Sequence, residues 1–150
     1  MRGGIHGRVC YKASLILGEH IEANRLGRVF TNDTFVKIRH DPEECRGPDL
    51  AYISYATQPE SSPVPTGALA PPLELAVEVG SPSNTLNELT MKASLYIASG
   101  VSVVLVLDPP SASALVFREN EPPQRFSIGD ELTISDILPG FAVPVKRFFE

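Results

Sequence analysis

The sequence predicts an α/β fold, because two strand patterns enclose one helix pattern in the second half of the chain. Residues 73–79 alternate large apolar side chains with small or acidic ones, which is typical of a strand that presents two different faces. Residues 101–107 are almost entirely apolar, as in a strand buried on both faces. Between them, apolar residues recur at helical spacing until Gly100, a residue suited to end a helix. We therefore expect a βαβ unit at the centre of the fold.

The first half of the chain is expected to contain a helix followed by a hairpin. Apolar residues recur at helical spacing from residue 5 to residue 26, and Gly27 is placed to end that helix. Residues 28–31 and 34–39 have the composition of short strands, and the Asn-Asp pair between them favours a tight turn. Residues 41–47 are polar and are expected to form a loop.

Two connections surround a further strand at residues 50–53. Pro48 and Asp49 lead into it, and a long proline-rich loop at residues 57–72 follows. Loops of this length are typically functional flaps or mobile segments, so we predict mobility. The helix of the βαβ unit is expected to begin after Ser81–Asn84, whose side chains suit an N-cap. Its apolar stripe consists of Leu86, Leu89, Ala93, Tyr96 and Ile97.

Length and composition favour one globular domain over residues 1–150. The 150 residues are 43% hydrophobic and 21% charged, an ordinary composition for a domain with its own core. No apolar run reaches the roughly 18 residues that a membrane span needs. The N-terminus lacks the apolar core of a signal peptide, and Cys10 and Cys45 lie outside any CxxC pair. We therefore expect a cytoplasmic protein with reduced thiols.

Charge is distributed unevenly along the chain. The formal net charge is −5, of which residues 1–50 contribute +1 (eight Lys or Arg, seven Asp or Glu) and residues 51–150 contribute −6 (five against eleven). This balance argues against a protein covered in nucleic-acid contacts. A local basic surface remains open, as does the simpler interpretation that these charges are only solvated. Such a surface would consist of Arg8, Lys12, Arg25, Arg28, Lys37 and Arg39.

Asp49, Glu78 and Lys92 are the candidate catalytic residues. Carboxylate oxygens are the preferred ligands of hard cations such as Mg²⁺, and a nearby ammonium group can stabilise charge developing on a phosphate. Glu78 is the strongest candidate, because a strand that buries apolar side chains rarely keeps a carboxylate without a partner. Simpler interpretations stay open: Asp49 as a turn or capping residue, and Glu78 as a charge at an exposed strand end. Lys92 could form a surface ion pair with Glu88, four residues earlier on the helix.

Other site chemistries find little support in the sequence. His6, His20 and His40 show no metal-ligand spacing, so a zinc site is disfavoured. Ser81 and Ser83 lack the glycine-flanked turn of a serine hydrolase. No glycine-rich phosphate loop follows a strand, which argues against a nucleotide-cofactor enzyme.

Six short motifs, taken in order and spacing, resemble a known family. They are Arg46–Ala51, Leu75–Ser83, Lys92 with Tyr96, Gly100–Val101, Asp108–Pro109 and Leu138–Phe141. Together they are similar to the Uma-type putative restriction endonucleases, a family common in bacteria and placed in the PD-(D/E)XK nuclease superfamily. The resemblance covers essentially the whole chain.

The resemblance implies a restriction-endonuclease-like PD-(D/E)XK core, in which a mixed sheet is flanked by helices. It implies that Asp49 and Glu78 hold Mg²⁺ or Mn²⁺ beside an activated water that cleaves nucleic-acid phosphodiester bonds, with DNA as the expected substrate. In the basic signature a lysine follows the glutamate by two residues, where this chain has Gly80. Lys92 is similar to the displaced lysine that some branches carry on the next helix. A homodimer is expected from the resemblance alone.

The chain also departs from the family pattern. Members usually carry an N-terminal segment with an acidic, strand-like motif, and this chain is expected to lack that segment. The alternative to a nuclease is therefore a catalytically degenerate module that acts in binding or regulation. Hydrolysis of a small phosphate ester by the same ligands is a third hypothesis.

Overall fold

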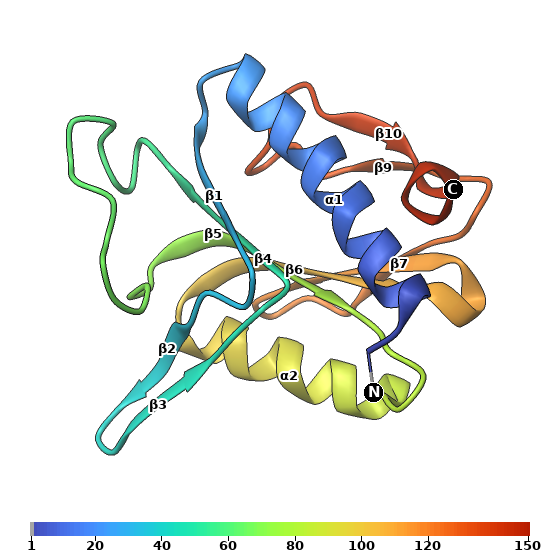
Figure 1. Ribbon diagram of the computed structural model, residues 1–150, viewed down its shortest axis with the longest axis horizontal. Helices are drawn as coiled ribbons and strands as arrows, with labels where there is room; N and C mark the ends of the chain where they lie inside the picture. The colour runs from blue at the N-terminus through green and yellow to red at the C-terminus, as the bar shows by residue number, and fades with distance from the viewer. Residues whose placement is uncertain (1) are drawn as a thin grey trace.

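The computed structural model describes residues 2–150 and confirms the α/β class (Figure 1). Its helices are α1 (Gly4–Ala23) and α2 (Leu86–Ser99), with the 3₁₀ turns η1 (Pro109–Ser111) and η2 (Val145–Phe149). Its strands are β1 (Gly27–Thr31), β2 (Val36–His40), β3 (Glu43–Arg46), β4 (Leu50–Ser54), β5 (Leu73–Val79), β6 (Val101–Asp108), β7 (Ser113–Arg118), β8 (Gln124–Phe126), β9 (Glu131–Thr133) and β10 (Ala142–Pro144). Within residues 2–150, neither helix has the length and apolar character needed to cross a membrane.

Six strands form one mixed sheet in the order β1-β4-β5-β6-β7-β8. Strands β5 and β6 are parallel, and the other neighbouring pairs of this sheet are antiparallel. Helix α2 covers one face, while α1 covers the other together with η2 and the β9–β10 pair (Figure 1). The predicted βαβ unit and the mixed sheet flanked by helices are confirmed.

An apolar cluster lies on each face of the sheet, and β5 contributes to both. Because side chains alternate along a strand, Leu75 and Val77 join the cluster under α1, and Ala76 joins the cluster under α2. Each large aliphatic side chain buried in this way contributes about 1.5–3 kcal/mol to folding. The same alternation directs Glu78 to the α2 side, into an otherwise apolar layer.

The ends of α2 are fixed by its caps. The N-cap is Thr85, one residue beyond the predicted segment 81–84, and it forms a capping box with Glu88. The backbone N–H of Glu88 donates to Thr85 Oγ1 at 3.1 Å, and the N–H of Thr85 donates to Glu88 Oε2 at 3.4 Å. Gly100 ends the helix with φ of 112°, as predicted. Leu86, predicted in the apolar stripe, is the first residue of α2 and is 50% exposed.

Helix α1 ends earlier than predicted. It stops at Ala23, with Asn24 as the C-cap, and Gly27 instead begins β1. A Cβ at Gly27 would lie only 2.1 Å from the carbonyl oxygen of Ile53 on β4. The close approach of β1 to β4 therefore requires glycine at this position. This packing requirement explains Gly27, which does not end the helix.

The predicted hairpin of residues 28–31 and 34–39 is wrong. Asn32 and Asp33 both have positive φ, as in a tight turn, yet β1 pairs with β4, and β2 pairs with β3 in a separate sheet. The predicted polar loop at residues 41–47 consequently contains strand β3. Strand β2 leaves the main sheet because Val36 is fully buried in the α2-side cluster, a tertiary preference that overrides the local turn signal.

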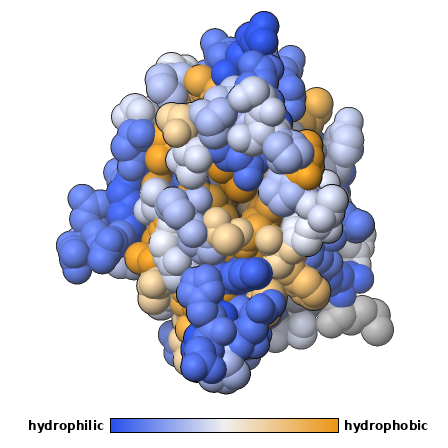
Figure 2. All heavy atoms as spheres, turned by 90° about the vertical axis from the view of Figure 1, so that its left-hand side faces the viewer, coloured by the Kyte–Doolittle hydropathy of each residue, from blue (hydrophilic) through white to orange (hydrophobic). Residues whose placement is uncertain are grey.

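Residues 55–72 form the long irregular connection that the sequence predicts. The guanidinium of Arg28 on β1 donates to the carbonyl oxygens of Glu60 at 2.9 Å and Ser62 at 2.6 Å, and to Gln58 Oε1 at 3.0 Å. The loop is therefore attached to β1, and its mobility stays a prediction. Figure 2 looks onto this loop and the β2–β3 hairpin and shows apolar atoms between the polar segments.

Candidate metal centre

Strand pairing brings Asp49 and Glu78 together. Strand β4 runs antiparallel to β5, and Asp49 precedes β4 where β5 ends. The N–H of Asp49 donates to the carbonyl oxygen of Val77 at 2.9 Å, and Asp49 Oδ2 accepts from the N–H of Val79 at 2.8 Å. Asp49 is thus hydrogen-bonded to Val77 and Val79, the residues on either side of Glu78. The two predicted carboxylates are thus neighbours at one end of the sheet, although 29 positions separate them in the sequence.

Glu78 is held inside the molecule, and among residues 2–150 Tyr96 donates a hydrogen bond to its side chain. It is 3% exposed, and Tyr96 on α2 donates its hydroxyl to Glu78 Oε1 at 3.0 Å. Burial, and then the charge of Asp49, raise the pKa of Glu78 to about 7, against the opposing effects of Lys92 and Tyr96. Near neutral pH the Glu78 carboxyl group can therefore gain or lose its proton, and a cation could take that proton's place.

Lys92 lies on α2 one turn before Tyr96 and is half-buried. Its positive charge acts on Glu78 and lowers the pKa of that carboxyl group. In residues 2–150 no ion pair joins it to Glu88, whose carboxylate instead caps α2. The structure therefore brings all three predicted residues to one end of β5, while their catalytic role stays a prediction.

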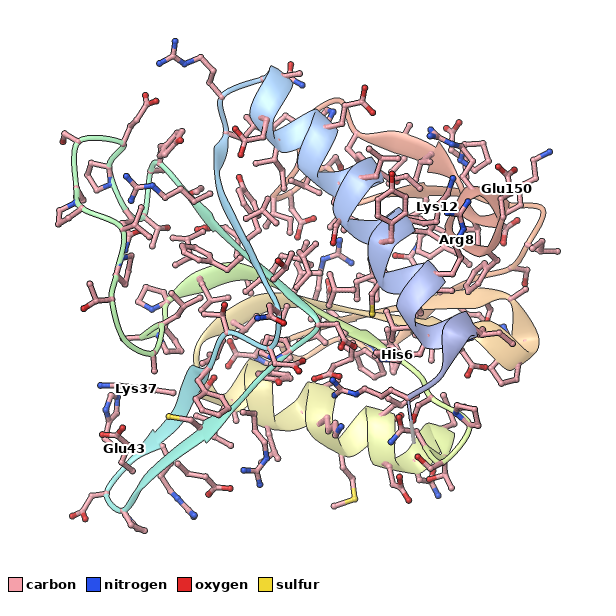
Figure 3. The ribbon with its side chains drawn as sticks, viewed as in Figure 1. His6, Arg8, Lys12, Lys37, Glu43 and Glu150 are labelled. Carbon is pink, nitrogen blue, oxygen red and sulfur yellow. The ribbon has the colours of Figure 1, made fainter. Side chains whose placement is uncertain are left out.

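His6 and Cys10 lie on the α1 side of Asp49, opposite Glu78. The sequence analysis did not predict them as site residues. His6 is 6% exposed, and its Nε2 lies 3.4 Å from Asp49 Oδ2. Cys10 Sγ lies 3.6 Å from His6 Nδ1 and 3.8 Å from Nε2. Figure 3 shows His6 near the N-terminal end of α1, which covers the sheet at this point. The sequence does contain a signal for this pair, because a spacing of four residues puts a histidine and a cysteine on one helix face. The spacing among the three histidines does not reveal it.

A cavity of about 260 Å³ opens onto the α1 side of Asp49. His6, Cys10 and Asp49 all line it, together with Arg2 and Asp33. Arg2 donates from Nη1 to both carboxylate oxygens of Asp33, at 3.1 and 3.0 Å, and lies 3.8 Å from Asp49 Oδ1. Burial, and then the charge of Asp49, raise the pKa of the Cys10 thiol to about 12. Asp49 is therefore reached from the cavity on this side and covered by protein on the other.

The six basic residues proposed as a local surface do not form one patch. Figure 3 places Lys37 on the β2–β3 hairpin, away from Arg8 and Lys12 on α1. Arg8 donates to the carbonyl oxygen of Glu150 at 3.2 Å, and Arg25 pairs with Glu60 at 3.1 Å. The simpler interpretation, in which these are separate surface charges, describes them better.

Comparison with known proteins agrees with the predicted family. The Uma2 family, described as a putative restriction endonuclease, matches residues 1–146. A crystal structure described as a putative nuclease belonging to DUF820, from Anabaena variabilis ATCC 29413, superposes with a TM-score of 0.84 over 99% of this chain and 82% of that chain, at 15% identity. No curated protein matches the chain.

The structural likeness shows a shared fold, and the family match covers nearly all of the sequence. The single-domain organisation over residues 1–150 and the absence of the family's N-terminal strand segment stay predictions. By the match over residues 1–146, the chain belongs to the Uma2 family of putative restriction endonucleases.

Proposed function

We propose that this protein is a divalent-metal-dependent nuclease in which Asp49 and Glu78 hold the cation. Its family and the description of the superposed structure both support a nuclease. The observation that carries the proposal is the placement of two largely buried carboxylates side by side at the end of β5. Such a pair is costly to maintain in an apolar layer unless a positive charge joins it.

The donor set fits Mg²⁺ or Mn²⁺. Both candidate ligands offer carboxylate oxygens, which hard divalent cations prefer. The charge of Asp49 raises the pKa of Glu78, so the two anions repel each other where a cation would attract both. When bound, such a cation would polarise a phosphate oxygen and lower the pKa of a water molecule.

The protein's own groups would orient this site and stabilise charge. The N–H of Val79 fixes one oxygen of Asp49, and Tyr96 fixes one oxygen of Glu78. Each carboxylate therefore keeps its other oxygen for a ligand. The ammonium of Lys92, whose charge already acts on Glu78, would stabilise negative charge on a phosphate at the transition state.

The substrate we propose is nucleic acid, with DNA as the first candidate, and the place of action is the cytoplasm. Cys10 and Cys45 are free thiols, which suits a reducing compartment. We also propose a homodimer. Helix α2 exposes Met91 and Leu95, at 69% and 44%, and these apolar side chains are suited to contact a second copy.

The experiment that tests this function compares cleavage of plasmid, linear duplex and single-stranded DNA by the purified protein with Mg²⁺ or Mn²⁺. We expect Glu78→Gln and Lys92→Met to lower the cleavage rate by about hundredfold or more, since electrostatic groups of this kind contribute about 2.7–4 kcal/mol. Glu74→Gln is the matched control, because Glu74 precedes Glu78 by four residues on β5 and accepts a hydrogen bond from the N–H of Ser54.

The contrary result is wild-type protein that leaves every DNA substrate intact with either cation. If Mn²⁺ still binds in that case, the degenerate binding module replaces the nuclease. If an aryl phosphate is hydrolysed while DNA is not, the small-ester hypothesis replaces it.

A further inference from the structure

We infer that His6, Cys10 and Asp49 form a binding site for a transition metal ion such as Zn²⁺. One donor atom from each residue lies within 4.8 Å of the other two. This set of one nitrogen, one sulfur and one oxygen differs in chemistry from the oxygen pair of Asp49 and Glu78. The inference rests on the geometry around Asp49 and does not depend on the proposed nuclease activity.

Two of the three separations between donor atoms are close to those of a tetrahedral zinc site, and the third is within 4.8 Å. Zinc bonds of about 2.05 Å to nitrogen, about 2.1 Å to carboxylate oxygen and about 2.3 Å to sulfur place nitrogen and oxygen about 3.4 Å apart, and nitrogen and sulfur about 3.6 Å apart. His6 Nε2 lies 3.4 Å from Asp49 Oδ2 and 3.8 Å from Cys10 Sγ. A typical hydrogen bond between the imidazole nitrogen and the carboxylate oxygen would be shorter, about 2.9 Å.

The elements that carry these residues hold them in place. His6 and Cys10 are one turn apart on α1, which is packed on the sheet through Val9. Asp49 Oδ2 also accepts from the N–H of Val79, which orients the carboxylate as the outer partners of metal ligands commonly do. The fold thus positions the three ligands before a metal ion binds.

The ligand types select a softer ion than Mg²⁺. Imidazole and thiolate favour zinc and other late transition metals, and three protein ligands leave one coordination position for water. On binding, the Cys10 thiol would release its proton to solvent and ligate as thiolate, so the balance is one metal ion bound and one proton released.

The approach to this site is open. The cavity of about 260 Å³ is lined by all three ligands, so an ion and its water need no rearrangement of the core. Arg2 lies 3.8 Å from Asp49 Oδ1, the carboxylate oxygen that the site does not use, and is engaged by Asp33. Its side chain is 51% exposed, so solvent reaches the guanidinium beside this site.

The test is binding of Co²⁺ and Zn²⁺ to the full chain without other divalent cations. Wild-type protein should show a thiolate-to-cobalt charge-transfer band, and calorimetry should give one zinc site. Cys10→Ser should abolish the band, and both Cys10→Ser and His6→Ala should weaken zinc binding by about tenfold or more. Cys45→Ser and His40→Ala are the matched controls, since both residues lie on the β2–β3 hairpin.

Three outcomes would overturn the inference: wild-type protein that binds neither Co²⁺ nor Zn²⁺, wild-type protein that binds Co²⁺ without the charge-transfer band, or a band that survives in Cys10→Ser. Circular dichroism of each variant without metal checks that it folds. Glu78→Gln separates the two proposals, because it should lose DNA cleavage with Mg²⁺ yet keep the cobalt band. Wild-type protein that shows the band but cleaves no DNA refutes only the nuclease.

Discussion

The two sides of Asp49 differ in chemistry and in access. On the α2 side, Glu78 is 3% exposed, bound by the Tyr96 hydroxyl and influenced by the charge of Lys92, so the donors are oxygens enclosed by protein. On the α1 side, His6 and Cys10 offer nitrogen and sulfur and line a cavity. The Asp49 carboxylate therefore lies between two kinds of donor: the enclosed oxygens of Glu78 on the α2 side, and the accessible nitrogen and sulfur of His6 and Cys10 on the α1 side.

The difference follows from where β4 enters the sheet. Asp49 immediately precedes β4 and lies beside the end of β5, at one end of the sheet and of the apolar layers on its two faces. Within those layers, a polar residue from α1 and one from α2 would be separated by the sheet itself. At the strand end Asp49 lies 3.4 Å from His6 of α1, and its charge acts on Glu78, so a single aspartate can serve both sides.

Replacing Asp49 should have the largest effect, because both donor sets include it. We expect Asp49→Asn to lose the cobalt charge-transfer band and to lower any Mg²⁺-dependent cleavage by about thousandfold, since metal ions supply several kcal/mol of transition-state stabilisation. The amide oxygen can still accept from the N–H of Val79, so the fold should persist. Asp33→Asn is the control, since Asp33 also contacts Arg2 but belongs to neither donor set. A variant that loses one activity and keeps the other would show that the two sides do not share this ligand.

The α2 side could be predicted from the sequence because its signals are local. The alternating strand at residues 73–79, the helix that ends at Gly100 and the apolar strand after it each follow a regular pattern. Glu78 is a candidate site residue because it is a carboxylate in a strand of mostly apolar side chains. Its partnership with Asp49 could be proposed from carboxylate chemistry and from the family resemblance, but the pairing of β4 with β5 that creates it is not visible in either segment alone.

The four-residue spacing of His6 and Cys10 is visible in the sequence, but their meeting with Asp49 on the α1 side could not be predicted, because it depends on the tertiary fold. His6 is 43 positions from Asp49 in the sequence, and no local pattern indicates that α1 lies next to the start of β4. The wrong hairpin has the same origin: the turn at Asn32 and Asp33 was recognised, but burial of Val36 decides where β2 goes. Local chemistry identified turns and strands, while long-range packing decided their partners.

The raised pKa of Glu78 gives the α2 side a distinctive pH dependence. Folded protein keeps the Glu78 proton up to about pH 7, whereas unfolded chains release it near 4.5. Between these values the folded state binds more protons, so stability falls as pH rises, by about 3 kcal/mol in total. Urea unfolding of wild-type protein at pH 4.5 and 8 should show this loss, and Glu78→Gln should lack it.

The exposed Glu131→Gln serves as the control for this measurement, and Mn²⁺ should reduce the wild-type loss by stabilising the ionised pair. Cys10→Ser should leave the loss nearly unchanged, which distinguishes the two sides of Asp49. An equally steep fall in Glu78→Gln would mean that another group causes it.

The smallest expected effect comes from Tyr96→Phe, which removes a single hydroxyl from the α2 side. The hydroxyl donates to Glu78 Oε1 at 3.0 Å and lowers the pKa of that carboxyl group, so its loss should raise the pKa further and cost about 1 kcal/mol of stability. If Glu78 must be ionised to bind the cation, the acid limb of the cleavage–pH profile should then move to higher pH, while the cobalt band stays unchanged. Tyr11→Phe, on the exposed side of α1, is the control. A limb that moves to lower pH would mean that the Tyr96 hydroxyl stabilises the protonated form, and the carboxylate would then have to bind its cation without help from α2.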